Sequence, residues 1–360
     1  MNAPPPSPTK PPVSDLGSLA DPTAVEHLGP CRTFDYSAAE LRSFMRSMLL
    51  VRRVEEQVGS WAERGLARCP CHLGIGQEAV AVGIGHALRP GDRLFGNHRS
   101  HAHYLAAGGD VFELLAEVLG RDAGCSRGMG GSMHLRSAST GFYGSVPIVG
   151  ATIPMAVGAA LAAKMDGGTD IAVAFFGDGA CEEGVLHESL NLARVYQLPV
   201  LFVCENNLYS SHLDIALRQP SDSVARFAHA HRMTATVLDG NDVTAVAHSV
   251  AGLVETMRRD RSPAFVEAVT YRWRGHVGPK EDIDVGIRRS VAQLQAWKER
   301  DPVARLERAL LPARADSEAS RSEIDAEVRA QVESAAVRAL AAPMPASSAL
   351  LRRVYFDGDR

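Results

Sequence analysis

The stretch 171-IAVAFFGDGACEEGVLHESLNLARVYQLPVLFVCENN-207 decides the fold of this chain. Residues 171–176 and 200–204 are short apolar runs rich in β-branched residues and phenylalanine, which is typical of buried parallel strands. Residues 182–197 between them are long enough for a helix that connects two parallel strands. The stretch therefore predicts a strand–helix–strand unit.

Polar residues follow both predicted strands at the point where each strand ends. Asp178 comes directly after the first run, and Asn207 follows the second. Because ligands of parallel sheets bind outside the carboxyl ends of the strands, we expect these two side chains to lie side by side in a crevice. Carboxylate and carboxamide oxygens are ligands that Mg²⁺ prefers, and the glycines beside Asp178 would let backbone N–H groups approach a phosphate closely. The pattern predicts a site for a magnesium-bound phosphate compound.

Gly177-Asp178-Gly179 has two other interpretations. Asp178 alone could serve only as a helix cap, but a turn does not need the second polar pair Asn206-Asn207. A nicotinamide site is disfavoured, because the third glycine position of the dinucleotide fingerprint is occupied by Glu182.

Composition excludes several classes of protein. A chain of 360 residues with a formal charge of −4 gives no electrostatic argument for nucleic acid or an anionic membrane as partner. No apolar run approaches the roughly 18 residues of a membrane span, and the N-terminus lacks the pattern of a secretory signal. Cys69-Pro70-Cys71-His72 has no second ligand pair at zinc spacing, so the six cysteines are expected to be reduced thiols of a cytoplasmic protein.

The chain divides into three parts on composition. Residues 1–33 hold eight of the twenty prolines and are expected to form a disordered tail. Residues 34–285 alternate helical and strand patterns, which predicts an α/β domain with a mostly parallel sheet. Its first helix is expected to begin at Ser37, with Glu40 completing a capping box. Residues 286–360 are charged and alanine-rich with helical periodicity, so we expect a helical extension and a C-terminal tail.

Several motifs between residues 65 and 278 occur together in one known family. The motifs are Cys71-His72-Leu73, Gly76-Gln77-Glu78-Ala79, Arg99-Ser100-His101, Gly124-Cys125-Ser126-Arg127-Gly128, Gly130-Gly131-Ser132-Met133-His134, Ile148-Val149-Gly150, Cys204-Glu205-Asn206-Asn207 and Tyr271-Arg272-Trp273-Arg274-Gly275-His276. With Gly177-Asp178-Gly179 they resemble the alpha subunit of the first component of the 2-oxo acid dehydrogenases, the family of pyruvate and acetoin dehydrogenases. The resemblance implies the thiamine-diphosphate-binding fold.

The resemblance also implies a set of site residues. The magnesium ligands would be Asp178, Asn207 and the backbone carbonyl of Tyr209. The residues that would bind thiamine diphosphate are His98, Arg99, Val149, Gly177, Asp178, Gly179, Ala180, Asn207, Arg272 and His276. His72 and His276 would face the reacting centre. His98 stands where many pyruvate enzymes carry tyrosine.

The family's partners and reaction follow from the same resemblance. It implies decarboxylation of a 2-oxo acid, or cleavage of acetoin, with transfer of the acyl group to a lipoyl acyltransferase. We find no glutamate in this chain for the cofactor's aminopyrimidine, so the resemblance implies a beta subunit and a heterotetramer. Two alternatives remain open at this point: an acyloin-forming or decarboxylating enzyme, suggested by the unusual residues 207–212, and a catalytically silent scaffold subunit.

Overall fold

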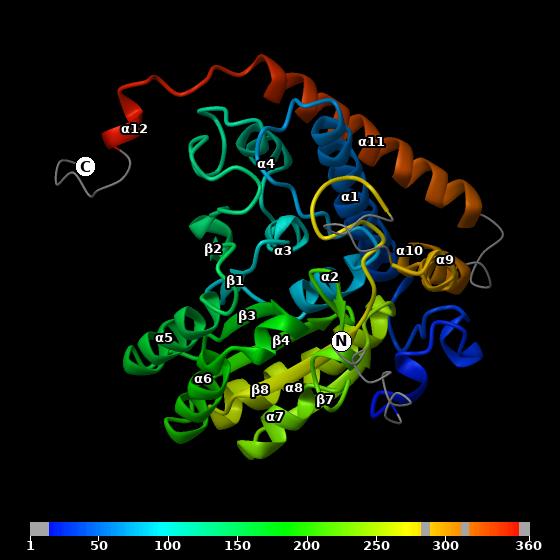
Figure 1. The fold of residues 1–360 in the computed structure, drawn as a ribbon, viewed down its shortest axis with the longest axis vertical. Helices are drawn as coiled ribbons and strands as arrows, with labels where there is room; N and C mark the ends of the chain where they lie inside the picture. The colour runs from blue at the N-terminus through cyan, green and yellow to red at the C-terminus, as the bar shows by residue number, and fades with distance from the viewer. Residues whose placement is uncertain (1–13, 282–288, 311–316, 353–360) are drawn as a thin grey trace, which may run out of the picture.

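The computed structural model describes residues 14–281, 289–310 and 317–352 of the chain. Its centre is a six-stranded parallel sheet in the order β2-β1-β3-β4-β8-β7 (Figure 1). The strands are β1 (Arg93–Gly96), β2 (Phe142–Ser145), β3 (Ala172–Gly177), β4 (Val200–Asn206), β7 (Thr234–Asp239) and β8 (Ala264–Val269). A small antiparallel hairpin, β5 (Tyr209–Ser210) with β6 (Leu213–Asp214), follows β4. The α/β class predicted from the sequence is confirmed.

Both faces of the sheet are covered by helices, which explains the continuous apolar runs of the central strands. Along β3, Val173 and Phe175 point into one core, whereas Ala174 and Phe176 point into the other. The first core is closed by α1 (Ala38–Glu63), α2 (Glu78–His86) and α8 (Val243–Asp260). The second is closed by α5 (Thr152–Met165), α6 (Gly184–Val195) and α7 (Ala225–Ala230).

The remaining helices surround this centre. They are α3 (His101–Ala106), α4 (Val111–Val118), α9 (Val291–Glu299), α10 (Pro302–Leu310), α11 (Ser317–Ala341) and α12 (Ala349–Arg352). The long helix α11 runs along the outside of α1 and α4 (Figure 1). Single 3-10 turns occur at Gly17–Leu19, Val25–His27, Ala138–Thr140, Asp178–Glu182 and Ile215–Leu217.

Several local expectations can be compared with these elements. The capping box is present, since the Ser37 hydroxyl accepts from the Glu40 N–H and the Glu40 carboxylate accepts from the Ser37 N–H. The edge strand β2, its neighbour β1 and the short helix α3 were not predicted. β1 and β2 have only four residues each and contain Arg93, Gly96 and Gly144, so no apolar run marks them. The helical extension is present in α9 to α12, and residues 282–288, 311–316 and 353–360 lie outside the described residues.

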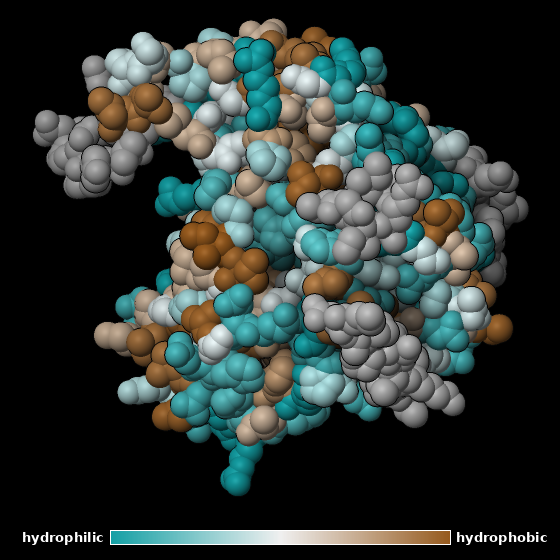
Figure 2. Space-filling model, viewed as in Figure 1, coloured by the Kyte–Doolittle hydropathy of each residue, from teal (hydrophilic) through white to brown (hydrophobic). Residues whose placement is uncertain are grey.

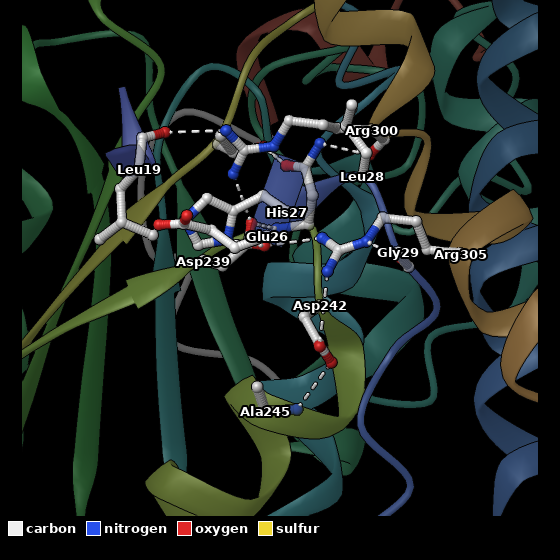
Figure 3. Close-up of polar contacts among 12 residues, drawn as sticks. Leu19, Glu26, His27, Leu28, Gly29, Asp239, Asp242, Ala245, Arg300 and Arg305 are labelled. Atoms are coloured by element: carbon white, nitrogen blue, oxygen red, sulfur yellow. Dashed lines mark hydrogen bonds and ion pairs between the residues drawn. The ribbon is translucent and has the colours of Figure 1, made fainter. Parts of the chain in front are cut away.

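The N-terminal segment differs from the disordered tail predicted for residues 1–33. Residues 14–33 pack against the domain, with Leu16 and Cys31 buried, while residues 1–13 lie outside the described residues. The backbone carbonyls of Leu19 and Gly29 accept hydrogen bonds from Arg300 (2.9 Å) and Arg305 (3.0 Å), as Figure 3 shows. The prediction was wrong for residues 14–33 because arginines from the C-terminal helices bind this segment's otherwise unpaired carbonyls.

The same arginines converge on one buried carboxylate. Asp239, at the end of β7, lies 3.0 Å from Arg300, 2.7 Å from Arg305 and 3.3 Å from a ring nitrogen of His27 (Figure 3). Burial opposes ionisation of Asp239, but His27 and the two arginines outweigh it and lower the pKa of the carboxyl. Asp239 therefore joins the N-terminal segment, the sheet and the C-terminal helices.

We expect Asp239→Asn to lower the free energy of unfolding at pH 7 by about 3 kcal/mol, because it removes the carboxylate that pairs with buried Arg300 and leaves Arg305 only the more distant Asp242, at 3.6 Å. Chemical denaturation of the two proteins measures this. The pKa of Asp239 is depressed, so its stabilisation is present above the unfolded value near pH 4 and is lost as the pH falls towards the folded pKa. The difference between the two proteins should therefore narrow in acid. Asp260→Asn, which removes an exposed partner of Arg259, is the control and should leave stability unchanged. Equal stability of wild type and Asp239→Asn at pH 7 would refute this role.

Candidate active site

The candidate site lies at the carboxyl ends of β3 and β4. From β1 the chain continues to β2 on one side of the sheet, whereas from the neighbouring strand β3 it continues to β4 on the other side. The order of the strands therefore reverses between β1 and β3. Ligands of open α/β sheets bind in the crevice at such a point. A cavity of about 170 Å³ opens there. The register that pairs Gly177 with Glu205 brings the residues after the two strands to the same edge.

The cavity collects most of the residues predicted from the sequence. Ten of them line it: His98, Arg99, Val149, Gly177, Asp178, Gly179, Ala180, Asn207, Tyr209 and His276. The other two contact residues of the cavity wall. The His72 ring lies against His98 and His276, and Arg272 donates to the Ser211 carbonyl.

Asp178 is a carboxylate buried at the floor of the site. It begins the 3-10 turn after β3 and is only 1% exposed. Its oxygen forms an ion pair with Arg218, which also binds Glu182. Burial raises the pKa of Asp178, while the guanidinium acts in the opposite direction. The carboxylate thus lies where a positive charge is needed, and in this structure Arg218 provides it.

The oxygen atoms beside Asp178 suit a hard divalent cation. The Asn207 Nδ2 group donates to Gln77 (3.3 Å), and Asn207 Oδ1 accepts from the Tyr209 N–H (3.3 Å). These bonds fix the carboxamide at the end of β4. A buried carboxylate, a carboxamide oxygen and a nearby backbone carbonyl are an all-oxygen donor set, which fits Mg²⁺.

Two buried arginines add positive charge around the cavity. Arg99 is 6% exposed and donates to the carbonyls of Leu73 (2.6 Å) and His276 (3.4 Å). Arg272 is 1% exposed and donates to the carbonyls of Arg274 (3.0 Å) and Ser211. Held in place by backbone carbonyls, the two guanidinium groups are suited to bind a multiply charged anion such as a diphosphate.

Three histidines form a cluster between the arginines. The ring centroids of His72, His98 and His276 lie 4.7 to 5.3 Å apart, and one ring nitrogen of each lies within 4.8 Å of the others. Burial, followed by the charge of Arg99, lowers the pKa of His72 to about 3 and also lowers that of His98. Both rings are therefore neutral at pH 7, and each offers one nitrogen as a hydrogen-bond donor and the other as an acceptor. His72 Nδ1 is buried with no hydrogen-bond partner among the described residues.

The structure also brings residues to the cavity that the sequence did not assign to the site. They are Gln77, Asn97, Ile148, Gly150, Thr152, Phe176, Glu205, Ser210 and Ser211. Arg218 was missed as well, although it contacts Asp178 directly. Gln77 and Glu205 lie within quoted motifs, so their proximity to the site could have been inferred. Ser210 and Arg218 depend on the path of the β5–β6 hairpin, for which the sequence carries no signal.

Comparison with known proteins decides the family. Residues 46–348 match the family model described as "Dehydrogenase E1 component". The chain belongs to the dehydrogenase E1 component family. The resemblance drawn from its motifs is confirmed, and this family implies thiamine diphosphate as cofactor.

Three relatives of this chain are informative. The "Pyruvate dehydrogenase E1 component subunit alpha-1, mitochondrial" of Oryza sativa subsp. japonica is 36% identical over 329 residues, covering 91% of this chain and 83% of its own. The "Pyruvate dehydrogenase E1 component subunit alpha" of Zymomonas mobilis is 38% identical over 317 residues, covering 88% of each chain. The protein of that name in Rickettsia felis is 35% identical over 315 residues, covering 88% of this chain and 95% of its own.

The described helices of the chain give no indication of a membrane span. Within residues 14–281, 289–310 and 317–352, none is both long enough and apolar enough to cross a bilayer.

Proposed function

We propose that this chain is the alpha subunit of a thiamine-diphosphate-dependent 2-oxo acid dehydrogenase of the pyruvate dehydrogenase type. The observation that carries the proposal is the meeting of Asp178, Asn207, Arg99 and the histidine cluster around one cavity at the strand ends. The names of relatives at 34–38% identity favour a dehydrogenase over the acyloin-forming and scaffold alternatives. Acetoin remains a candidate substrate beside pyruvate and branched-chain 2-oxo acids.

The residues of the cavity divide into two groups by the part of the cofactor that they would hold. Asp178, Asn207 and the Tyr209 carbonyl would bind Mg²⁺, and Arg99 and Arg272 would neutralise the diphosphate. Gly177, Gly179 and Ala180 would present their backbone to the diphosphate, and Val149 would contact the aminopyrimidine through its backbone. Arg218 would have to move away from Asp178 when the metal binds, because the guanidinium and the metal ion would compete for the same carboxylate.

The histidines would act on protons. When bound, thiamine diphosphate supplies the nucleophilic carbon that attacks the carbonyl of a 2-oxo acid. The neutral ring of His72, together with His276 beside it, would hold or transfer a proton next to this carbon, and His98 would contact the diphosphate. Neutrality of His72 and His98 follows from their burial next to Arg99.

A beta subunit is proposed to complete the site. Helix α5 is apolar on all sides and exposes Met155, Leu161 and Met165. Helix α6 exposes Leu192 and Val195, and Tyr196 directly after it is also exposed. Figure 2 shows apolar side chains gathered over these two helices. Ile148 and Val149 at the mouth of the cavity are 70% and 50% exposed. We propose that the beta subunit covers this surface in a heterotetramer, with a lipoyl acyltransferase as the acceptor of the acyl group.

The free thiols of all six cysteines support a reducing, cytoplasmic location.

The proposal is tested by coexpressing the chain with its candidate beta subunit. The purified complex should reduce an artificial electron acceptor when given thiamine diphosphate, Mg²⁺ and a 2-oxo acid or acetoin. Absence of activity on every such substrate, with the cofactor bound, would overturn the dehydrogenase assignment. Condensation products formed without a lipoyl partner would favour the acyloin-forming alternative.

Gly179 allows a test of the backbone approach to the diphosphate. A Cβ at this position would lie 2.4 Å from the Ser210 hydroxyl oxygen and 2.9 Å from Ser210 Cβ. Gly179→Ala is expected to weaken thiamine diphosphate binding to the assembled complex by about 10- to 100-fold, which corresponds to the 1–3 kcal/mol typical of overpacking. Calorimetric titration of thiamine diphosphate into the complex measures this change in affinity. The double variant Gly179→Ala, Ser210→Gly should recover most of the affinity. Wild-type affinity of the single variant would show that the close approach does not matter.

A further inference from the structure

Two thiols lie beside the candidate site without a role in the proposed function. Cys69 and Cys71 are separated by the exposed Pro70, and their sulfur atoms are 4.0 Å apart. Cys69 is partly exposed, whereas Cys71 is 2% exposed. All six cysteines of the chain lie in its described part and are free thiols. This pair thus combines an accessible sulfur with a buried one at short distance.

The surroundings of Cys69 favour its reactive, deprotonated form. The hydrogen bond with the Cys71 thiol lowers the pKa of Cys69 to about 6, and the nearby His101 acts in the same direction. Burial opposes a charge on His101, but the Glu55 carboxylate at 2.9 Å outweighs it and raises the pKa of this imidazole. The second ring nitrogen of His101 lies 2.9 Å from the Ser132 hydroxyl, so the ring is held in place. Thiols of low pKa with access to solvent are the ones that peroxides oxidise.

The other cysteines lack this combination. Cys181 and Cys204 also lie close together, with sulfurs 3.9 Å apart, but both are buried at 1% and 0% exposure. Cys125 is partly exposed, yet burial raises the pKa of its thiol to about 11. Cys69 is therefore expected to be oxidised first.

Hydrogen bonds connect the pair to the candidate active site. The carbonyl of Cys71 accepts from the Gly278 N–H at 2.8 Å, two residues after His276. His72 follows directly in the chain, and the next carbonyl, that of Leu73, accepts from Arg99. A change in the backbone at Cys71 would therefore move two of the clustered histidines and one arginine.

We propose that Cys69 and Cys71 are a peroxide-sensitive dithiol whose oxidation to a disulfide displaces His72 and the Gly278 contact. In the first step the Cys69 thiolate attacks one oxygen of hydrogen peroxide, the O–O bond breaks, and sulfenic acid and hydroxide form. In the second step the Cys71 sulfur attacks the Cys69 sulfur, the S–O bond breaks, and water leaves as the disulfide forms. Overall, two thiols are oxidised, one peroxide is reduced to two waters, and a dithiol reductant reverses the change.

To test this, the complex of the full chain with the beta subunit is treated with hydrogen peroxide. The mass of the chain is then measured by mass spectrometry. The expected result is a loss of about 2 Da per chain, mapped to a peptide that bridges Cys69 and Cys71 and restored by dithiothreitol. Cys69→Ser should prevent the change, and Cys125→Ser, the matched control, should behave like wild type. Activity of the complex should fall at least about tenfold with the mass change and return on reduction, since His72 and Arg99 move.

Two outcomes would overturn the proposal. One is alkylation of both Cys69 and Cys71 after a peroxide treatment that oxidises Cys125. The other is an irreversible gain of oxygen on Cys69 without a bridge to Cys71. The mass change does not depend on the proposed function, so an inactive complex that still forms the disulfide would argue against the enzymatic assignment alone.

Discussion

Asp178→Asn should reduce the turnover of the assembled complex by at least about 1,000-fold, which corresponds to about 4 kcal/mol of lost stabilisation. The variant keeps the shape of the side chain and one oxygen but removes the negative charge that we propose binds Mg²⁺. Asp178 is 1% exposed and begins the turn between β3 and α6, so its carboxylate is held in place by the backbone of that turn. Turnover at saturating cofactor, measured over a range of Mg²⁺ concentrations, gives the result.

Glu182→Gln is the matched control for this substitution. Glu182 binds the same guanidinium, that of Arg218, but its side chain is 39% exposed. Its loss should change turnover by no more than about threefold, because an exposed ion pair contributes little. If Asp178→Asn retained a tenth or more of the wild-type turnover, the magnesium role of Asp178 would be wrong.

His72→Asn is expected to lower turnover by about 100- to 10,000-fold while leaving thiamine diphosphate affinity within about threefold of wild type. The amide can form a hydrogen bond but cannot transfer a proton, and the proposed diphosphate contacts are made by Arg99 and Arg272. Steady-state kinetics with a 2-oxo acid, together with calorimetric titration of the cofactor, separates the two quantities.

The pH dependence adds a second test of His72. Burial and Arg99 hold its pKa near 3, so the ring remains neutral as the pH falls through the ordinary histidine range. The turnover that depends on His72 should therefore be constant from about pH 8 to about pH 5. His187→Asn on α6, a ring that packs against Phe227, is the control and should leave turnover unchanged. Wild-type turnover in His72→Asn, or a matching loss of cofactor affinity, would contradict the proton-transfer role.

The strand ends could be predicted because their signal is local. The apolar runs before Asp178 and Asn207 define β3 and β4, and parallel pairing then brings the two side chains to one edge. Helices with strong N-caps, such as α1 after Ser37, could be predicted for the same reason.

Other features arise from contacts that are distant in sequence. Arg218 reaches Asp178 only because the β5–β6 hairpin turns the chain back over the site. Residues 14–33 are ordered by Arg300 and Arg305, which lie more than 270 positions away. The high proline content of this segment predicted disorder. That prediction failed because composition cannot show which remote side chains will bind a backbone carbonyl.

The ion pair between Arg218 and Asp178 has a consequence for assembly of the site. A guanidinium that already neutralises the carboxylate must be displaced before a metal can bind, so metal and cofactor binding should be accompanied by movement of residues 207–219. The sequence predicts the candidate metal ligands but not this competition.

The most direct measurement of the central claim is a calorimetric titration of thiamine diphosphate into the complex of this chain with its beta subunit, with Mg²⁺ and again with a chelator. We predict one cofactor bound per alpha chain with Mg²⁺, loss of binding on chelation, and the same loss in Asp178→Asn. Binding that is unaffected by both the chelator and Asp178→Asn, or no binding to the wild-type complex, would contradict it.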